Sequence, residues 1–218
     1  MSELSAALLW EITLRTLMVC GLALALALAL GLPVGIALGR RRFAGRGALV
    51  SVVNAGMGAP PVVVGLLVAL LLWRNGPLGE LAWMYRPEAM VLAQVLIALP
   101  LVVGITLAAV GALDEDWELQ VRTLGVPRRW RFWLLIREIR MGLLAAVIAA
   151  LGGILSEVGA VMMVGGNLEG ETRVLTTSIL MYTQMGDFEA ALGLAAVLLG
   201  LTLVLAALLT AVQQGGRR

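Results

Sequence analysis

Long apolar runs separated by short polar stretches dominate the pattern of this chain. A helix needs ~20 residues to cross the ~30 Å hydrocarbon core of a bilayer, and five runs reach that length. They cover residues 14–38, 50–73, 88–113, 141–164 and 190–212. Residues 22–30 alternate Leu and Ala with the period of a strand, but an unpaired strand in lipid would leave its backbone groups without hydrogen bonds. We therefore predict an all-α membrane protein with five transmembrane helices.

The composition agrees with this pattern. Of the 218 residues, 61% are hydrophobic and 14% are charged, which favours a single membrane domain, residues 1–218, over a soluble one. The formal net charge of +2 gives no support for binding nucleic acid. With no histidine and one cysteine, Cys20, the chain is not expected to hold a metal ion or an internal disulfide.

The arginines predict the orientation of the spans. All 16 basic residues are Arg, and most of them follow the first, third and fifth spans. These are Arg40, Arg41, Arg42, Arg46, Arg122, Arg128, Arg129, Arg131, Arg137, Arg140, Arg217 and Arg218. Because positively charged loops stay in the cytoplasm, we expect the N-terminus outside and the C-terminus inside. An odd number of spans without a visible internal repeat favours a homodimer.

A polar, arginine-rich segment, 114–140, separates the third and fourth apolar runs. Apolar residues recur at spacings of three and four at its start, which predicts a short amphipathic helix over 114–124. These positions are Leu113, Trp117, Val121 and Leu124. Such a helix can lie on the inner membrane surface with its arginines on anionic headgroups, or it can dock on a soluble partner. The residues alone leave both interpretations open.

Polar residues mark the limits of this helix. Asp114 is expected to cap its start, and Glu118 can pair with Arg122 one turn later, which contributes about 0.3–0.5 kcal/mol. Gly125 followed by Pro127 is a pattern that ends helices. A second short helix is expected to begin at Pro127 and run toward the fourth span.

Two prolines interrupt the second span. Pro60 and Pro61 lie near its middle, where Pro61 removes a backbone hydrogen bond and forces a kink or a break. Backbone groups freed at this depth must face protein or water, which is a common construction for transporter gates and sites. Kinks that serve only packing are nearly as frequent. The prolines and the nearby Asn54 are therefore candidates for a path or gate, with a packing role as the alternative.

The segment around Gly125 resembles the cytoplasmic EAA loop in permease subunits of binding-protein-dependent ABC importers. That loop contains Glu-Ala-Ala, then a Gly and, further on, Leu-Pro. When Gly125 is aligned, the Glu-Ala-Ala and Leu-Pro positions fall on Leu119, Gln120, Val121, Arg137 and Glu138. Glu118 lies one residue early. The similarity is therefore carried by Gly125 and the apolar positions that flank it.

Three further runs resemble the permease subunit of tungstate importers, which is related to molybdate and sulfate permeases. They are Pro-Pro-Val-Val-Val-Gly at 60–65, Ser-Glu-Val-Gly-Ala-Val-Met-Met-Val-Gly-Gly-Asn at 156–167 and Thr-Arg-Val-Leu-Thr-Thr at 172–177. The resemblance extends over nearly the whole chain, from about residue 13. It implies the type I permease fold of ABC importers and the import of an oxyanion, tungstate in the first place and molybdate as the alternative.

The resemblance also implies partners. The chain would work as a homodimer in the inner membrane, with two cytoplasmic ATP-binding cassette subunits and an extracytoplasmic substrate-binding protein. ATP and Mg would bind to the ATPase subunits, since this chain has no Gly-x-x-x-x-Gly-Lys-Ser/Thr loop, and we expect no enzyme activity and no cofactor in the chain itself. A stand-alone secondary transporter or channel is the alternative function.

On this interpretation the helix over 114–124 couples transport to the ATPase. Its candidate contact residues are Trp117, Glu118, Leu119, Val121, Arg122, Leu124, Gly125 and Pro127. The candidates for the path or gate are Asn54, Pro60, Pro61, Ser156, Glu157 and Asn167. An unpaired charge within a span costs ~2.5–3.5 kcal/mol, and a bare carboxylate would repel an anion. We therefore expect Glu157 to be structural or part of a gate, hydrogen-bonded to backbone or to an arginine, while Ser156 and Asn167 can contact an anion or join helices.

Overall fold

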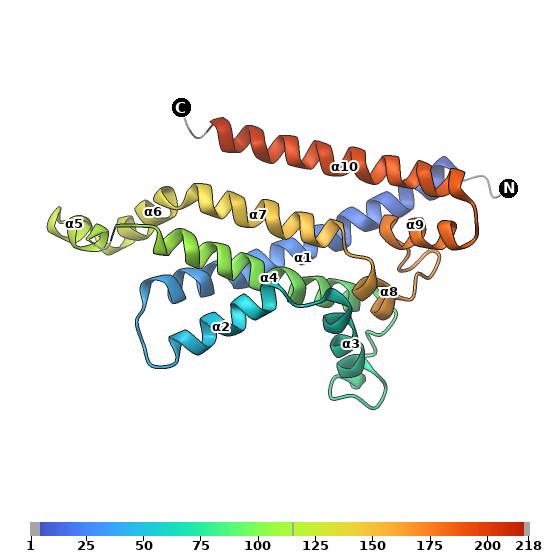
Figure 1. Ribbon diagram of the computed structural model, residues 1–218, viewed down its shortest axis with the longest axis horizontal. Helices are drawn as coiled ribbons and strands as arrows, with labels where there is room; N and C mark the ends of the chain where they lie inside the picture. The colour runs from blue at the N-terminus through green and yellow to red at the C-terminus, as the bar shows by residue number, and fades with distance from the viewer. Residues whose placement is uncertain (1–4, 115, 216–218) are drawn as a thin grey trace.

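The computed structural model describes residues 5–114 and 116–215, and every regular element within them is a helix. Four long helices lie side by side along the longest axis of the molecule (Figure 1). They are α1 (Ala6–Arg40), α4 (Pro87–Gly111), α7 (Arg140–Leu155) and α10 (Phe188–Gly215). The shorter elements are α2 (Arg46–Met57), α3 (Pro61–Leu72), the 3-10 turn η1 (Gly79–Leu81), α5 (Trp117–Thr123), α6 (Arg128–Glu138), α8 (Gly159–Gly165) and α9 (Leu175–Gln184). The prediction of an all-α membrane protein is confirmed.

Three of the described helices, α1, α4 and α10, are each long and apolar enough to cross a membrane. Two pairs reach that length and composition only together: α2 with α3, which are bent by 105°, and α7 with α8, which are bent by 59°. The five predicted spans fall on these five units. Because a bent pair can either cross the membrane or re-enter it, the number of five crossings stays a prediction.

Close contact between α1 and α4 holds the centre of the bundle together. Glycines on α1 face β-branched residues on α4 at matching spacings of four. A Cβ at Gly35 would lie 2.7 Å from Cβ of Thr106, and a Cβ at Gly39 would lie 2.6 Å from Cβ of Val110. Small residues let two helix backbones approach and gain packing contacts in lipid, where the hydrophobic effect between helices is absent.

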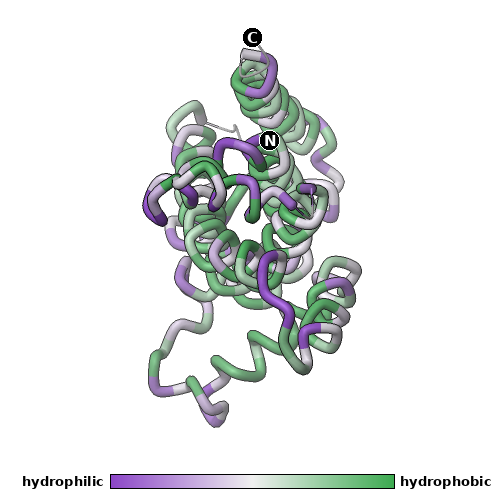
Figure 2. Tube along the Cα trace, turned by 90° about the vertical axis from the view of Figure 1, so that its left-hand side faces the viewer, coloured by the Kyte–Doolittle hydropathy of each residue, from purple (hydrophilic) through white to green (hydrophobic). Residues whose placement is uncertain are grey.

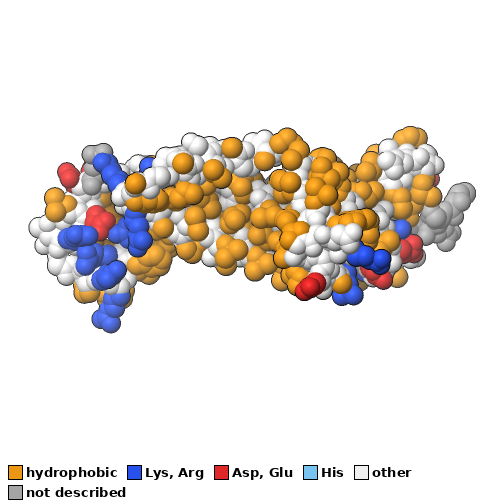
Figure 3. All heavy atoms as spheres, turned by 90° about the horizontal axis from the view of Figure 1, so that it is seen from below, with side chains coloured by type: hydrophobic (Ala, Val, Ile, Leu, Met, Phe, Trp, Pro, Cys, Tyr) orange, Lys and Arg blue, Asp and Glu red, His pale blue; other side chains and the backbone are white. Residues whose placement is uncertain are grey.

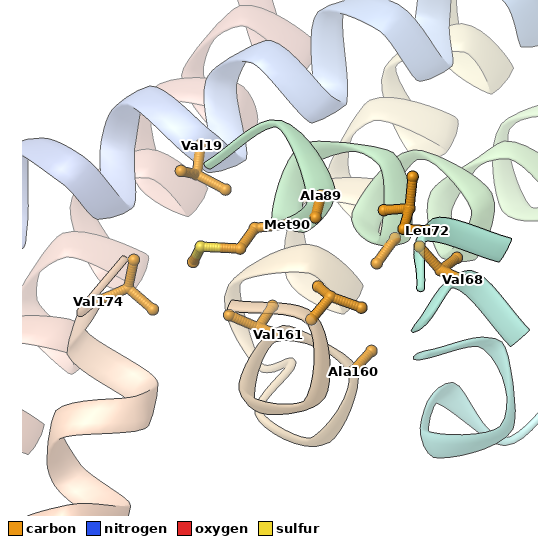
Figure 4. Close-up of a cluster of buried hydrophobic side chains, with 10 residues drawn as sticks. Val19, Val68, Leu72, Ala89, Met90, Ala160, Val161 and Val174 are labelled. Atoms are coloured by element: carbon orange, nitrogen blue, oxygen red, sulfur yellow. The ribbon is translucent and has the colours of Figure 1, made fainter. Parts of the chain in front are cut away.

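The end of the bundle that carries α8 and α9 is fastened by a buried apolar cluster (Figure 4). Val68 and Leu72 reach into it from α3, Met90 from α4 and Val161 from α8. Figure 1 shows α3 leaving the direction of the long helices at this place. The cluster therefore fixes α3 to α4 and α8, although α3 no longer runs along the bundle.

Helix α10 lies at the edge of the bundle (Figure 2), and few of its residues are buried. Its buried residues, Ala190, Ala191 and Leu194, are all near its start. Leu199 and Leu203 farther along are exposed. Lipid tails are as apolar as leucine, so this surface suits a bilayer or another apolar chain.

Many of the arginines predicted to be cytoplasmic gather at one end of the molecule, which we call the arginine end. It consists of α5, α6 and the turn that follows α1, and arginine side chains stand out there at the left of Figure 3. Arg217 and Arg218 lie outside the described residues. The spatial grouping is the one that the positive-inside rule requires, while the direction in which the bundle crosses the membrane stays a prediction.

Candidate functional site

Helix α5 lies at the arginine end and is shorter than expected. It runs from Trp117 to Thr123, with Asp116 at the N-cap position, so the prediction that Asp114 caps the helix start is wrong. The carboxylate of Asp114 accepts a hydrogen bond from the Asp116 N–H at 2.9 Å, and its carbonyl accepts one from the Trp117 N–H at 3.0 Å. These local bonds form a turn before the helix, which delays its start.

Glu118 joins α5 to the end of α1. Its carboxylate accepts a hydrogen bond from Arg122 at 2.6 Å, the predicted pair on α5, and one from Arg40 at 2.9 Å. The pair with Arg122 is confirmed, whereas the pair with Arg40 was not predicted, because it connects residues far apart in the sequence. The two guanidinium groups, Arg40 first, lower the pKa of Glu118 below its ordinary value of 4.5. The carboxylate is therefore charged at neutral pH.

The apolar residues of the α5 segment do not share one face. Trp117 packs against the chain's own core, which includes Leu135 of α6, and Val121 is buried. In contrast, Leu124 is 79% exposed and Leu119 is 63% exposed. The predicted single stripe is wrong for Leu124 because α5 ends one residue earlier. The surface open to a partner is thus formed by Leu119 and Leu124 rather than by Trp117 and Val121.

Gly125 ends this segment as its sequence predicts. Its φ of +69° lies in the left-handed region, where a residue without Cβ is favoured, and its N–H donates to the carbonyl of Arg122 at 2.9 Å. Pro127 then occupies the N-cap position of α6. The predicted second short helix is confirmed.

The second span breaks at its two prolines, as predicted. Pro60 is the N-cap residue of α3 and Pro61 is its first helical residue, a position where a missing N–H costs nothing. The chain turns by 105° between α2 and α3. Asn54 lies on α2 before the turn and is exposed. The break leaves Pro60 exposed on the outside of the bundle.

The fourth span is also broken, which was not predicted. The sequence placed Glu157 within a continuous helix, but it lies between α7 and α8, where the chain bends by 59°. Glu157 is 7% exposed, and its Oε1 accepts a hydrogen bond from the Ala160 N–H at 2.7 Å. The expected bond to backbone is therefore present. The Ser156 hydroxyl donates to the carbonyl of Gly153 at 3.1 Å.

A signal for this break exists in the sequence. Gly152 and Gly153 precede it and Gly159 follows it, and glycine weakens a helix by about 1 kcal/mol relative to alanine. An acidic residue three positions before a free N–H is also typical of a helix start. Read together, these features mark residues 156–158 as the end of one helix and the beginning of another.

The two breaks adjoin in space. A Cβ at Gly65 of α3 would lie 2.5 Å from Cα of Ala160 in α8, and a Cβ at Gly159 would lie 2.7 Å from a methyl group of Val62. The starts of α3 and α8 are therefore in contact. This brings Pro60, Pro61, Ser156 and Glu157 into one region, which we call the paired breaks.

Asn167 does not belong to this region. It follows the end of α8 with a φ of +54°, and its amide N–H donates to the sulfur of Met181 at 3.4 Å. Another polar group on this side was missed by sequence reasoning: the buried Thr16 hydroxyl accepts a hydrogen bond from the Leu175 N–H at 2.9 Å. Thr16 thereby connects α1 to the start of α9. The two residues are far apart in the sequence, so no local pattern predicts this contact.

Acidic residues do not form a metal centre within the described part of the chain, since no three His, Cys, Asp or Glu side chains gather in residues 5–114 and 116–215.

Apolar helices with paired breaks, together with an arginine end that carries a short exposed helix, define a multi-pass membrane protein of the transport class. Residues 31–218 match the family described as "Binding-protein-dependent transport system inner membrane component". The chain belongs to this family, and it is a multi-pass protein of the inner membrane.

Three similar proteins are each described as the permease of a transport system. The chain is 41% identical over 208 residues to a "Probable anion ABC transporter permease protein" of Haloferax volcanii, covering 93% of this chain and 90% of the relative. It is 39% identical over 180 residues to a "Tungstate uptake system permease protein" of Peptoclostridium acidaminophilum, covering 83% and 79%. It is 30% identical over 193 residues to the "Molybdenum transport system permease protein" of Escherichia coli K12, covering 84% of both chains. The predicted resemblance to tungstate-type ABC permeases is confirmed.

Proposed function

We propose that this chain is the membrane-spanning subunit of an ATP-driven importer for an oxyanion, tungstate in the first place and molybdate as the alternative. The observation that carries the proposal is an exposed short helix at the arginine end of a chain that is 39% identical to a tungstate uptake permease. Two copies of the chain would enclose the path, two cytoplasmic ATPase subunits would bind ATP and Mg, and a binding protein would deliver the anion outside. The chain itself would hold no cofactor.

The arginine end supports a mechanical role for α5. Leu119 and Leu124 are open to a partner, while Glu118 ties the helix to Arg40 at the end of α1. On its inner side, Trp117 packs against a cluster that includes Leu135 of α6, and α6 leads directly into α7. An ATPase that moves α5 would therefore move α1 and α7 together.

A movement of α7 would be transmitted to the paired breaks. Helix α7 ends at Leu155, two residues before Glu157, and the start of α8 contacts the start of α3, so a shift of α7 changes how the two breaks meet. The carboxylate of Glu157 is buried and bonded to the Ala160 N–H, so this side chain is directed at backbone and is not a ligand for the anion. We infer that the breaks act as a gate in alternating access.

Uptake into proteoliposomes tests the function. The complex with its ATPase and binding protein would be reconstituted with ATP inside the vesicles, and radiolabelled tungstate would be compared with molybdate and sulfate. We expect ATP-dependent accumulation of tungstate, with molybdate as a weaker substrate. Accumulation by the permease alone, without ATPase, would favour the stand-alone transporter instead.

A further inference from the structure

A groove lies at the arginine end between the last turns of α1 and the segment from α5 to α6. It has a volume of about 1390 Å³. Its floor is apolar, with Leu28, Leu32 and Ile36 on one side, at spacings of four along α1, and Phe132 and Ile136 of α6 on the other. The spacing places the three α1 residues on one face of the helix, so the floor is a continuous apolar strip.

Arginines form the rim of this groove. Arg40, Arg41, Arg122, Arg128 and Arg131 line it, against the single carboxylate of Glu118. That carboxylate is already paired with Arg40 and Arg122. The Nε–H of Arg131 is buried and has no hydrogen-bond partner among the described residues. The rim thus has an excess of positive charge, and one of its arginines carries a donor that no described residue satisfies.

The length of the groove matches half a bilayer. Twelve residues separate Leu28 from Arg40 on α1, which corresponds to ~18 Å of helix. One leaflet contributes about 15 Å of hydrocarbon to the ~30 Å core. With Arg40 at the level of the headgroups, the apolar strip therefore reaches close to the middle of the membrane.

We propose that this groove binds one anionic phospholipid of the inner leaflet, with its phosphate on Arg128 and Arg131 and an acyl chain along the strip formed by Leu28, Leu32 and Phe132. The inference rests on the orientation in the proposed function, which places the arginine end in the cytoplasm. Basic pockets at the cytoplasmic ends of membrane helices suit anionic headgroups. A free oxyanion would use the arginines only, whereas a phospholipid matches both the rim and the strip.

The lipid would stiffen the coupling helix. Its headgroup would lie beside Arg122 and Glu118 of α5 and would bridge α6 to the end of α1. A phosphate at this place would reduce the repulsion among the arginines of these three elements. Anionic lipid should therefore be retained by the complete transporter, not only by the isolated chain.

Native mass spectrometry of the purified transporter complex tests the proposal. Phosphatidylglycerol and phosphatidylcholine with identical acyl chains are added in turn, and the fraction of complex that keeps a lipid is measured. We expect the complex to retain phosphatidylglycerol. In Arg131→Gln the retained fraction should fall about fivefold, because one arginine near an anionic lipid surface contributes about 1 kcal/mol of attraction. Arg129→Gln is the matched control, because Arg129 is exposed on the same helix and does not line the groove.

A second pair of variants tests the apolar strip without changing charge. Ala29 lines the groove, so Ala29→Trp should block the acyl chain and abolish lipid retention. Ala25→Trp, one turn earlier and equally exposed on α1, should not. Binding of added tungstate is measured in parallel, so that binding of a free oxyanion is distinguished from binding of a phospholipid headgroup.

Three outcomes would overturn the proposal. Equal retention of phosphatidylglycerol and phosphatidylcholine would show that the arginines do not select an anionic headgroup. A loss in Arg131→Gln with normal retention in Ala29→Trp would show that the arginines hold the headgroup while no acyl chain lies in the groove. Lipid on the isolated chain but not on the complex would show that the ATPase fills the groove. None of these results depends on transport, so a failure of the proposed tungstate import would be seen separately in the uptake assay.

Discussion

Glu157 is a buried acid in an apolar region, and its surroundings explain how it is tolerated. A carboxylate in hydrocarbon is costly unless it is bonded. The break between α7 and α8 frees the Ala160 N–H, and Oε1 of Glu157 accepts its hydrogen bond at 2.7 Å. The break therefore supplies a hydrogen-bond donor to the acid. The acid in turn satisfies a backbone N–H that is not paired within the helix.

Substitutions at Glu157 should separate hydrogen bonding from charge. Glu157→Gln keeps an oxygen that can accept from Ala160, so we expect near-normal thermal stability of the purified complex in detergent. Glu157→Leu leaves that buried N–H unpaired, which costs about 1–3 kcal/mol, and should lower the melting temperature clearly. Equal losses in both variants would show that the negative charge itself is required.

The pH dependence of Glu118 follows from its lowered pKa. The ion pairs with Arg40 and Arg122 stabilise the charged form in the folded protein, so their contribution is complete above the ordinary pKa of 4.5 and is lost as the pH falls through the lowered value. The pairs are partly exposed and screened, which limits their contribution to at most about 1 kcal/mol.

The melting temperature of the wild type should therefore exceed that of Glu118→Gln at pH 7. The difference should close only below pH 4.5. Glu138→Gln, an exposed carboxylate on α6, is the control and should show no such pattern. A difference that disappears between pH 7 and 5 would contradict the assigned pKa direction.

At the scale of elements, the contact between α3 and α8 depends on Gly65. A Cβ there would lie 2.5 Å from Cα of Ala160, which is backbone and cannot rotate away. Gly65→Ala should force the two helices apart, with a loss of about 1–3 kcal/mol in stability and impaired uptake. Gly193→Ala on α10 is the control, because a Cβ at Gly193 meets no atom within 4 Å. Normal uptake by Gly65→Ala would argue against a gate at the paired breaks.

The exposed end of α5 offers a test of docking. Leu124→Asp places a charge on a side chain that is 79% exposed, so membrane insertion should be unchanged while co-purification of the ATPase falls at least tenfold, equivalent to about 1.4 kcal/mol. Gly125→Pro should have the same effect, because proline cannot adopt the φ of +69° found there. Leu81→Asp, at an exposed position of η1, is the control. Normal recovery of ATPase with Leu124→Asp would exclude this docking surface.

Apolar runs were sufficient to locate the five units that are long and apolar enough to span a membrane, because lipid permits few other structures for such segments. Helix α9 lies between two of these runs and was not predicted. The break at Pro60 and Pro61 was also predictable, since proline acts locally. The break at Glu157 was missed because the hydropathy of residues 141–164 suggests one continuous helix. The contacts of Glu118 with Arg40 and of Gly65 with Ala160 depend on the packing of distant elements, which periodicity does not report.

At the scale of the whole molecule, the single chain leaves α3 incompletely covered. Val62, Val63, Leu66, Leu67 and Leu70 of α3 are exposed. Helix α10 also exposes apolar residues, but it runs along the bundle and can face lipid over its full length (Figure 1). Helix α3 runs at 105° to α2 and carries the paired breaks, so a homodimer that encloses a path at these breaks would bring α3 close to its counterpart.

Distances between spin labels can test this arrangement of the homodimer. In a Cys20→Ala background, Leu66→Cys places one label on the exposed side of α3 and Leu203→Cys places one on the exposed side of α10. Pulsed electron paramagnetic resonance on the reconstituted complex should give a shorter distance between subunits for Leu66 than for Leu203, because α3 would lie near the two-fold axis and α10 at the lipid boundary. The reverse order would place α10 at the axis and separate the paired breaks from the path. A lack of any dipolar coupling at both sites would contradict the homodimer itself.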